Sequence, residues 1–183
     1  MIDLREDISK SKKVELIKSI IAVNDNIPVN YISDAWVNLN VENIRSIDDV
    51  YNVMSKSWLV GFVEAEGSIY YTKKDSKRIV HCFNVTQKLD LIVLVSIKYI
   101  FNIKAAIQYH KKKNYYSLST TNSSTIEYII NYFSYKVDAS YFLGVKGFEF
   151  KIWKRTYHKF KGNYDKLERI RNWINKLRNK HKI

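Results

Sequence analysis

The sequence contains few of the residues that crosslink a chain, interrupt it or carry it through a membrane. Its 183 residues include one cysteine, one proline and five glycines. The lone thiol, Cys82, excludes an internal disulfide and a zinc site built from several cysteines, which favours a reducing compartment. No apolar run approaches the roughly 20 residues that a membrane-spanning helix needs, and no secretory signal opens the sequence. We therefore expect no membrane association.

Acidic residues are scarce relative to basic ones. Lysine and arginine total 31 against 18 aspartates and glutamates, a formal net charge of +13. Such an excess favours a polyanionic partner, and nucleic acid is the usual one. The alternative is a solvated basic surface without a ligand. Hydrophobic residues make up 46% of the chain, which is enough to build a core.

Two regions differ in pattern. Residues 1–54 predict a helical extension and connector, with a helix over 11–24 that ends before Pro28 and a second helix that starts after Ser46 as its N-cap. Residues 55–183 predict a separate domain with sharper periodicity. This division gives an N-terminal extension followed by a nucleic-acid-binding domain.

The second region predicts an α+β fold with an antiparallel sheet. A short apolar helix closed by Gly67 precedes two strands, a buried helix, a hairpin and a further helix that Ser123 or Ser124 would cap. Two basic helices follow. The expected ranges are helix 58–66, strands 68–74 and 78–87, helix 89–101, strands 105–110 and 115–120, and helices 125–133, 145–160 and 164–180. The order is αββαββα plus a basic helical tail.

The helix over 58–66 has features that suggest chemistry. Gly61 and Ala65 are small and four residues apart, so they share a face that another helix can approach closely. Glu64 and Glu66 lie at the carbonyl end of the helix, where the dipole disfavours carboxylates, which suggests a divalent cation. Gly67 permits a left-handed conformation for the turn into the strand. The alternative is an amphipathic helix with two solvated glutamates.

This segment resembles the motif of the LAGLIDADG family of homing endonucleases and intron maturases. The stretch from Leu59 to Gly67 reads LVGFVEAEG. Residues 83–88 resemble the end of the family's second strand, and residues 146–153 resemble its late basic segment. The resemblance runs from about residue 55 to residue 180. In the residues just before the motif and just after the second expected strand, the chain is similar to the C-terminal half of mitochondrial two-motif members.

The resemblance implies that the motif helix packs against a second copy from another subunit or repeat. The residues expected on this pairing helix are Leu59, Gly61, Phe62 and Ala65. One motif per chain implies that an active enzyme needs a homodimer or a second LAGLIDADG chain.

The resemblance also implies a catalytic set. Glu66 matches the acidic position that binds the catalytic metal, usually Mg²⁺, whereas Glu64 matches an acid that is more often structural. Gln87 matches a position near the scissile phosphate that orders solvent. Lys146 matches the basic residue near the site.

Strand alternation predicts an outward sheet face suited to base edges and phosphates. Phe83 and Val85 point inward, which leaves Cys82 outward, and His81 is expected to be structural. The side chains expected to contact nucleic acid are Tyr70, Thr72, Lys74, Asn84, Thr86, Gln108, His110, Lys112, Tyr115 and Ser117. Basic residues of the last two helices are expected to contact phosphates.

Three functions follow. The favoured one is a metal-dependent, site-specific DNA endonuclease that acts as a dimer. The alternative is an RNA-binding protein without cleavage, either an intron maturase or a component of a mitochondrial ribosome or ribonucleoprotein. A small interaction domain that binds no nucleic acid is disfavoured by the +13 charge. The family resemblance and the AT-rich codon usage that Lys, Asn, Ile and Tyr imply both favour the mitochondrial matrix.

Overall fold

The computed structural model describes residues 36, 39–136 and 139–180 of the chain. The helix expected over 11–24 lies outside the described residues. The elements are η2 (Val41–Asn43), α2 (Ile47–Val53), α3 (Lys56–Glu66), β1 (Gly67–Asp75), β2 (Arg78–Gln87), α4 (Leu91–Ile100), β3 (Gln108–His110), η3 (Lys111–Lys113), β4 (Tyr115–Thr120), α5 (Ser123–Phe133), β5 (Ser134–Lys136), β6 (Ala139–Ser140), α6 (Val145–Phe160) and α7 (Tyr164–Lys180).

Four strands form an antiparallel sheet in the order β1-β2-β4-β3. The long β1–β2 hairpin pairs Gly67 with Val85, and β2 in turn pairs Phe83 with Thr120 of β4. From α3 to α5 the elements follow the order αββαββα. The α+β fold expected from the sequence is therefore confirmed.

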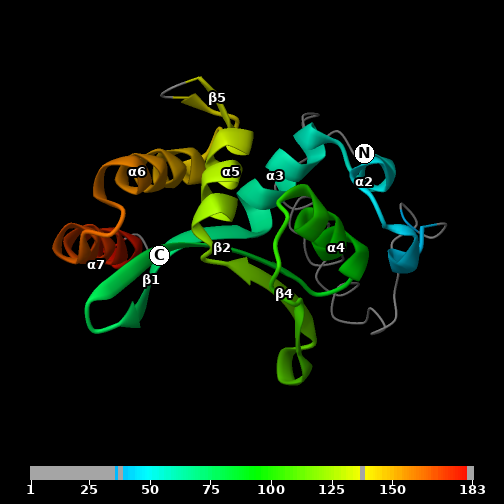
Figure 1. Ribbon diagram of the computed structural model, residues 1–183, viewed down its shortest axis with the longest axis horizontal. Helices are drawn as coiled ribbons and strands as arrows, with labels where there is room; N and C mark the ends of the chain where they lie inside the picture. Colours follow the sequence, from blue (N-terminus) through cyan, green and yellow to red (C-terminus); the bar gives the residue numbers. More distant parts are fainter. Residues whose placement is uncertain (1–35, 37–38, 137–138, 181–183) are drawn as a thin grey trace, which may run out of the picture.

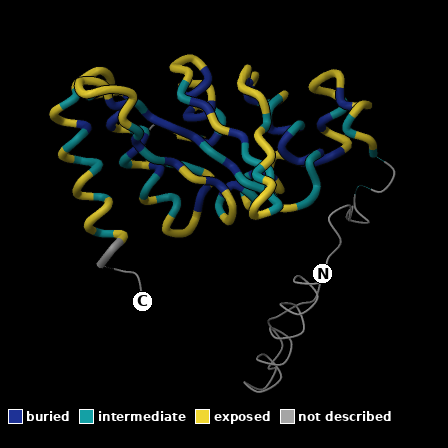
Figure 2. The backbone as a smooth tube through the Cα atoms, turned by 90° about the horizontal axis from the view of Figure 1, so that it is seen from below, coloured by how far each residue is buried: buried dark blue, intermediate teal, exposed yellow. Residues whose placement is uncertain are grey.

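The helices pack against one face of this sheet (Figure 1). Alternation along the strands directs Ile69, Phe83, Val85 and Leu118 into the core, where each is at most 4% exposed. Helices α3, α4 and α5 cover the middle of the sheet, whereas α6 and α7 lie beside β1 at one end. The tube in Figure 2 shows buried stretches gathered along the strands and the inner sides of the helices.

Helix α2 belongs to the same core. Ser46 caps it through a capping box with Asp49, as the sequence predicted for its N-cap. Val50 and Val53 are buried in the cluster that includes the sheet residues, and α2 packs against α4. Among the described residues, no helix is long and apolar enough to cross a membrane.

Two local expectations were wrong. The N-cap of α5 is Asn122, whose side chain accepts the backbone N–H of Thr125; Ser123 already lies inside the helix. Asn122 caps as well as serine does, so the type of residue alone could not choose between adjacent candidates. The small β5–β6 hairpin, which links α5 to α6, was not expected, because strands of two or three residues have no measurable periodicity.

Candidate nucleic-acid interface and catalytic corner

The motif helix ends at a glycine for a reason that the sequence did not reveal. Gly67 has φ −75° and ψ 149°, which is extended backbone and not the left-handed conformation we expected. A Cβ at this position would lie 2.6 Å from both the carbonyl oxygen and Cγ1 of Val63. Close packing of the first residue of β1 against α3 therefore requires a glycine here.

One face of α3 is open. Gly61 and Ala65 are exposed, and a Cβ on Gly61 would meet no atom within 4 Å in the described part of the chain. Phe62 is half-buried and stacks on Trp58, with ring centroids 5.1 Å apart, so it borders this face. Leu59 is wholly buried in the core, and its assignment to the pairing helix surface is wrong. It lies on the side of α3 that faces the sheet, as Val63 does.

Glu64 and Glu66 are differently engaged. The Glu64 carboxylate accepts the backbone N–H groups of Leu143 at 3.1 Å and of Gly144, the N-cap of α6, at 2.6 Å. Glu66 is exposed at the last position of α3, and it accepts no hydrogen bond from the residues that the structure describes. Glu64 thus ties α3 to α6, while the Glu66 carboxylate is uncommitted.

Lys146 approaches the same corner from α6. Its ammonium donates to the carbonyl oxygen of Gly67, the residue that follows Glu66. Burial lowers the pKa of Lys146; Glu149, Glu64 and Glu66 oppose this shift, and Arg178 reinforces it. The structure therefore brings Lys146 beside Glu66, although the two are 80 residues apart in sequence.

Gln87 lies at the same end of the sheet. It is the last residue of β2, two positions beyond the pair between Gly67 and Val85, and it faces Tyr116 of β4. The strand register thus directs Gln87 towards the end of α3 without a hydrogen bond to Glu66 or Lys146 among the described residues. No group of three or more His, Cys, Asp or Glu side chains in the described ranges could hold a metal ion. Within the described part of the chain, Glu66 is the one carboxylate at this corner that accepts no hydrogen bond.

Nearly all the predicted nucleic-acid contacts share the outward face of the sheet. Residues directly opposite in antiparallel strands lie on one face, and the pairs found here are Ser68–Asn84–Ser119, Tyr70–Cys82, Thr86–Ser117–Gln108 and His110–Tyr115. Thr72 continues this face along β1 by alternation. Lys74 is exposed at the irregularity between Lys73 and Asp75, where the regular pairing of β1 with β2 is interrupted. Lys112 is exposed in η3, at the tip of the β3–β4 hairpin, so it extends the face without belonging to a strand.

Two parts of this face are less open than expected. Cys82 lies on the outward side but is only 3% exposed, and it faces Tyr70 across the strand pair. Burial, with the contact to Cys82, raises the pKa of Tyr70 to about 12, so its hydroxyl stays neutral. The His110 ring stacks on Tyr115 at 4.4 Å and shares a 2.8 Å hydrogen bond with the hydroxyl of Ser117. His110 is thus held in a fixed orientation at the hairpin.

His81 is structural, as expected. It is buried on the inward face, where its Nε2 lies 3.0 Å from the Thr156 hydroxyl, and that hydroxyl is 2.7 Å from the Tyr71 hydroxyl. Burial lowers the pKa of His81 to about 4. The ring is therefore neutral at physiological pH and connects β2 to α6.

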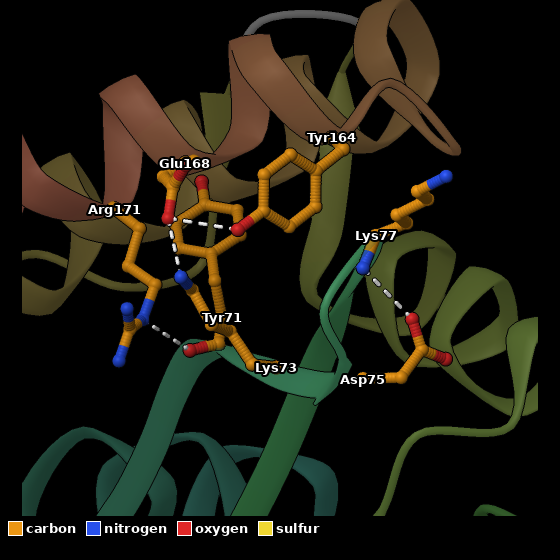
Figure 3. A network of polar contacts seen from close by, with 7 residues as sticks. All are labelled: Tyr71, Lys73, Asp75, Lys77, Tyr164, Glu168 and Arg171. Carbon is orange, nitrogen blue, oxygen red and sulfur yellow. Dashed lines mark hydrogen bonds and ion pairs between the residues drawn. The ribbon is translucent and has the colours of Figure 1, made fainter.

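Two arginines of α7 are engaged with the sheet, which corrects part of the expectation that they contact phosphates. Arg171 donates from Nε to the carbonyl of Tyr71 at 3.2 Å, and Arg178 donates to the carbonyl of Ile69. Figure 3 shows Arg171 reaching β1, next to the ion pair between Lys73 and Glu168. Together with Lys146 on Gly67, these arginines place cationic side chains on the carbonyl groups of three alternate residues in the first half of β1.

A hollow on the described surface lies elsewhere. It measures about 600 Å³ and lies between the β5–β6 hairpin and α6, with Phe148, Lys151 and Arg155 in its lining. Glu66, Gln87 and Lys146 do not line it. The candidate catalytic corner therefore lies outside this hollow.

Comparison with known proteins places this geometry in a family. The sequence profile of the LAGLIDADG endonuclease family matches residues 59–157. The probable intron-encoded endonuclease Cox1-I1b of Schizosaccharomyces pombe is 40% identical over 133 residues, which cover 70% of this chain and 33% of that protein. The probable intron-encoded endonuclease aI3 of Dictyostelium citrinum is 34% identical over 76 residues, covering 42% and 29%. The chain thus spans about a third of the length of these relatives.

Solved structures agree on the fold. A point mutant of the meganuclease I-SmaMI superposes with a TM-score of 0.55 at 21% identity, over 66% of this chain and 43% of that one. A second point mutant of the same protein gives a TM-score of 0.52 at 23% identity with the same coverage. At this level of identity the likeness supports the architecture alone.

Proposed function

Because the chain belongs to the LAGLIDADG endonuclease family, we propose that it binds DNA on the outward face of its sheet and cleaves it site-specifically when two motif helices pair. The observation that carries this proposal is the corner formed by Glu66 and Lys146. An uncommitted carboxylate, a lysine and the end of a polar sheet face meet there. The sheet face presents amide, hydroxyl and imidazole groups, which read base edges, and lysines, which meet phosphates.

The exposed face at Gly61 and Ala65 supports pairing through α3. Each chain supplies one Glu66, and hydrolysis of both DNA strands needs two such corners. The partner is a second copy of this chain or another LAGLIDADG unit. Small residues let the two helix backbones approach closely.

Glu66 suits Mg²⁺, because this cation prefers oxygen ligands and is commonly held by one or two carboxylates together with water and phosphate. When bound there, Mg²⁺ would activate water and neutralise charge at the attacked phosphate. Lys146 places a positive charge beside the same phosphate, where negative charge develops during hydrolysis. Gln87, at the end of β2, would orient solvent.

The test is cleavage of a DNA library in Mg²⁺, with the assembly state measured in parallel by light scattering. The dimer, or the chain paired with its partner unit, is expected to cut a limited set of sites. Glu66→Gln should abolish cleavage and leave DNA affinity within a few-fold of the wild-type value. Cleavage by Glu66→Gln at the wild-type rate would refute the assignment of Glu66.

RNA binding without cleavage is the competing outcome of the same experiment. Paired wild-type protein that cuts no member of the library, yet binds structured RNA far more tightly than duplex DNA, would identify a maturase or a ribonucleoprotein component. In either case the salt dependence of affinity should be steep, because lysines replace counterions on the phosphates.

We further propose the mitochondrial matrix as the site of action. The supports are the abundance of Lys, Asn, Ile and Tyr, whose codons are AT-rich, and the intron-encoded relatives. Cell fractionation with an antibody to the native protein tests this, and recovery outside the mitochondrial fraction would refute it.

A further inference from the structure

Lys146 lies among charged side chains contributed by three helices. Glu149 follows it by three residues on α6, so the two side chains lie on the same side of that helix. Arg178 arrives from the end of α7, and Glu64 and Glu66 come from α3. Only Lys146 and the two α3 glutamates were recognisable as site residues in the sequence.

Arg178 holds two groups at once. Its Nε donates to Oε1 of Glu149 at 2.8 Å, and its Nη2 lies 3.4 Å from the carbonyl oxygen of Ile69 on β1. The acceptor of Lys146, the Gly67 carbonyl, is two residues earlier on the same strand edge. The ion pair of Arg178 with Glu149 therefore lies directly beside the hydrogen bond of Lys146.

We propose that Glu149 and Arg178 are positioning residues for Lys146: their ion pair keeps the Glu149 carboxylate from capturing the Lys146 ammonium, which then stays on the Gly67 carbonyl beside Glu66. A Lys–Glu pair three residues apart on a helix is favourable in itself. Arg178 competes for this carboxylate through a directional guanidinium bond and is anchored on β1 as well. For catalysis, this inference rests on the proposed role of Lys146 in cleavage.

The charges around Lys146 predict the direction in which its pKa should change in each variant. Glu149, Glu64 and Glu66 raise the pKa of Lys146, whereas burial and Arg178 lower it. Removal of Arg178 should therefore raise this pKa, both by deleting a cation and by freeing Glu149. Removal of Glu149 should lower it, because Lys146 and Arg178 are then neighbouring cations without that carboxylate.

The test measures Lys146 directly. Trace acylation with acetic anhydride across a pH series, read by mass spectrometry of the Lys146 peptide, gives its pKa in each variant without any need for activity. Arg178→Gln should raise the pKa, and Glu149→Gln should lower it, each by about half a pH unit for such partly solvated charges. The double variant E149Q/R178Q should return close to the wild-type value.

Arg171→Gln is the matched control. Arg171 lies on the same helix and donates to the carbonyl of Tyr71, two residues after the Ile69 carbonyl that Arg178 contacts. It is not one of the groups that shift the pKa of Lys146. Its removal should leave the pKa of Lys146 unchanged. An unchanged pKa in both test variants, or shifts of the same sign, would overturn the inference.

Cleavage supplies the second readout. Arg178→Gln should slow single-turnover cleavage by about tenfold to a hundredfold through misplacement of Lys146, with a much smaller change in DNA affinity. Arg178→Lys, which keeps the charge without the forked geometry, should recover part of the loss. If Arg178→Gln weakens DNA binding and leaves single-turnover cleavage intact, Arg178 is a phosphate contact and not a positioning residue. If wild-type protein cuts no DNA, the proposed function fails. The acylation series would still test whether Glu149 and Arg178 act on Lys146.

Discussion

The Glu64 carboxylate accepts the backbone N–H of Gly144 at 2.6 Å, so the motif helix directly holds the N-cap of the helix that carries Lys146. Two glutamates only two residues apart thus have separate tasks, because a rotation of about 200° places them on different sides of the helix. Glu64 aligns α6, and Glu66 remains available to a ligand. The motif helix therefore holds the start of α6 in place and also carries the exposed face that we propose for pairing.

Glu64→Ala should destabilise the fold. The substitution leaves the N–H groups of Leu143 and Gly144 without their carboxylate, at a cost of about 1–2 kcal/mol in the free energy of unfolding. Urea denaturation measures this change. Glu66→Gln is the control, and it should unfold at the wild-type urea concentration. Equal stability of wild type and Glu64→Ala would contradict the structural role.

Gly67→Ala should be costly for steric reasons. The new Cβ would lie 2.6 Å from backbone and side-chain atoms of Val63, and neither α3 nor β1 moves freely. We expect a loss of about 1–3 kcal/mol in the free energy of unfolding, as for other overpacked sites. Thermal and urea denaturation test it, and a stability equal to that of the wild type would show that the contact relaxes without cost.

Gly61→Ala should have opposite effects on folding and pairing. Its Cβ meets open space within the described chain, so alanine should stabilise α3 by up to about 1 kcal/mol. If α3 pairs through this face, the same methyl group obstructs the partner helix. Sedimentation should then show weaker self-association, or weaker binding of the partner unit, despite higher stability. Unchanged association would place the pairing face elsewhere.

His81 should make stability depend on pH. Burial lowers its pKa to about 4 from 6.5, so between these values the unfolded chain binds a proton that the folded protein does not. The free energy of unfolding therefore keeps its full value above pH 6.5 and decreases as the pH falls towards 4, by up to about 3 kcal/mol. His81→Gln should flatten this slope in urea denaturation, whereas His110→Gln, on the outward face and not one of the groups that shift His81, should retain it. Parallel slopes in wild type and His81→Gln would refute the assignment.

Two variants separate reading of bases from contact with phosphates. Asn84 lies in the middle of the outward face, and Lys112 lies at the hairpin tip. Asn84→Ala should relax preference at one base pair by about 1–3 kcal/mol, whereas Lys112→Ala should weaken all sequences alike and reduce the salt slope by about one. Binding assays over a substituted target series measure both. If Asn84→Ala weakened binding to all targets equally, Asn84 would not be a base-reading residue.

The sequence predicted this site unevenly, for reasons visible at particular residues. The small residues Gly61 and Ala65 marked an open helix face, since spacing along a helix is local information. Leu59 was misplaced because which apolar residue faces the sheet depends on the rotation of α3 against β1 and β2. Gly67 was correctly placed at the helix end, but for the wrong reason, because its contact with Val63 is a packing fact. Arg178 was only one of many basic residues in the tail.

By itself, the sequence determined the order of the longer helices and strands from α3 onward, the alternation that sorts the sheet into a buried and an outward face, and the motif that identifies the family. These properties depend on periods of two and about 3.6 residues, which a single segment carries. Only the tertiary structure decided that Glu64 is committed and Glu66 uncommitted, and that Glu149 and Arg178 surround Lys146. These relations join residues separated by up to 109 positions, from Ile69 to Arg178. Packing of separate helices on one sheet creates such contacts, and no local pattern records them.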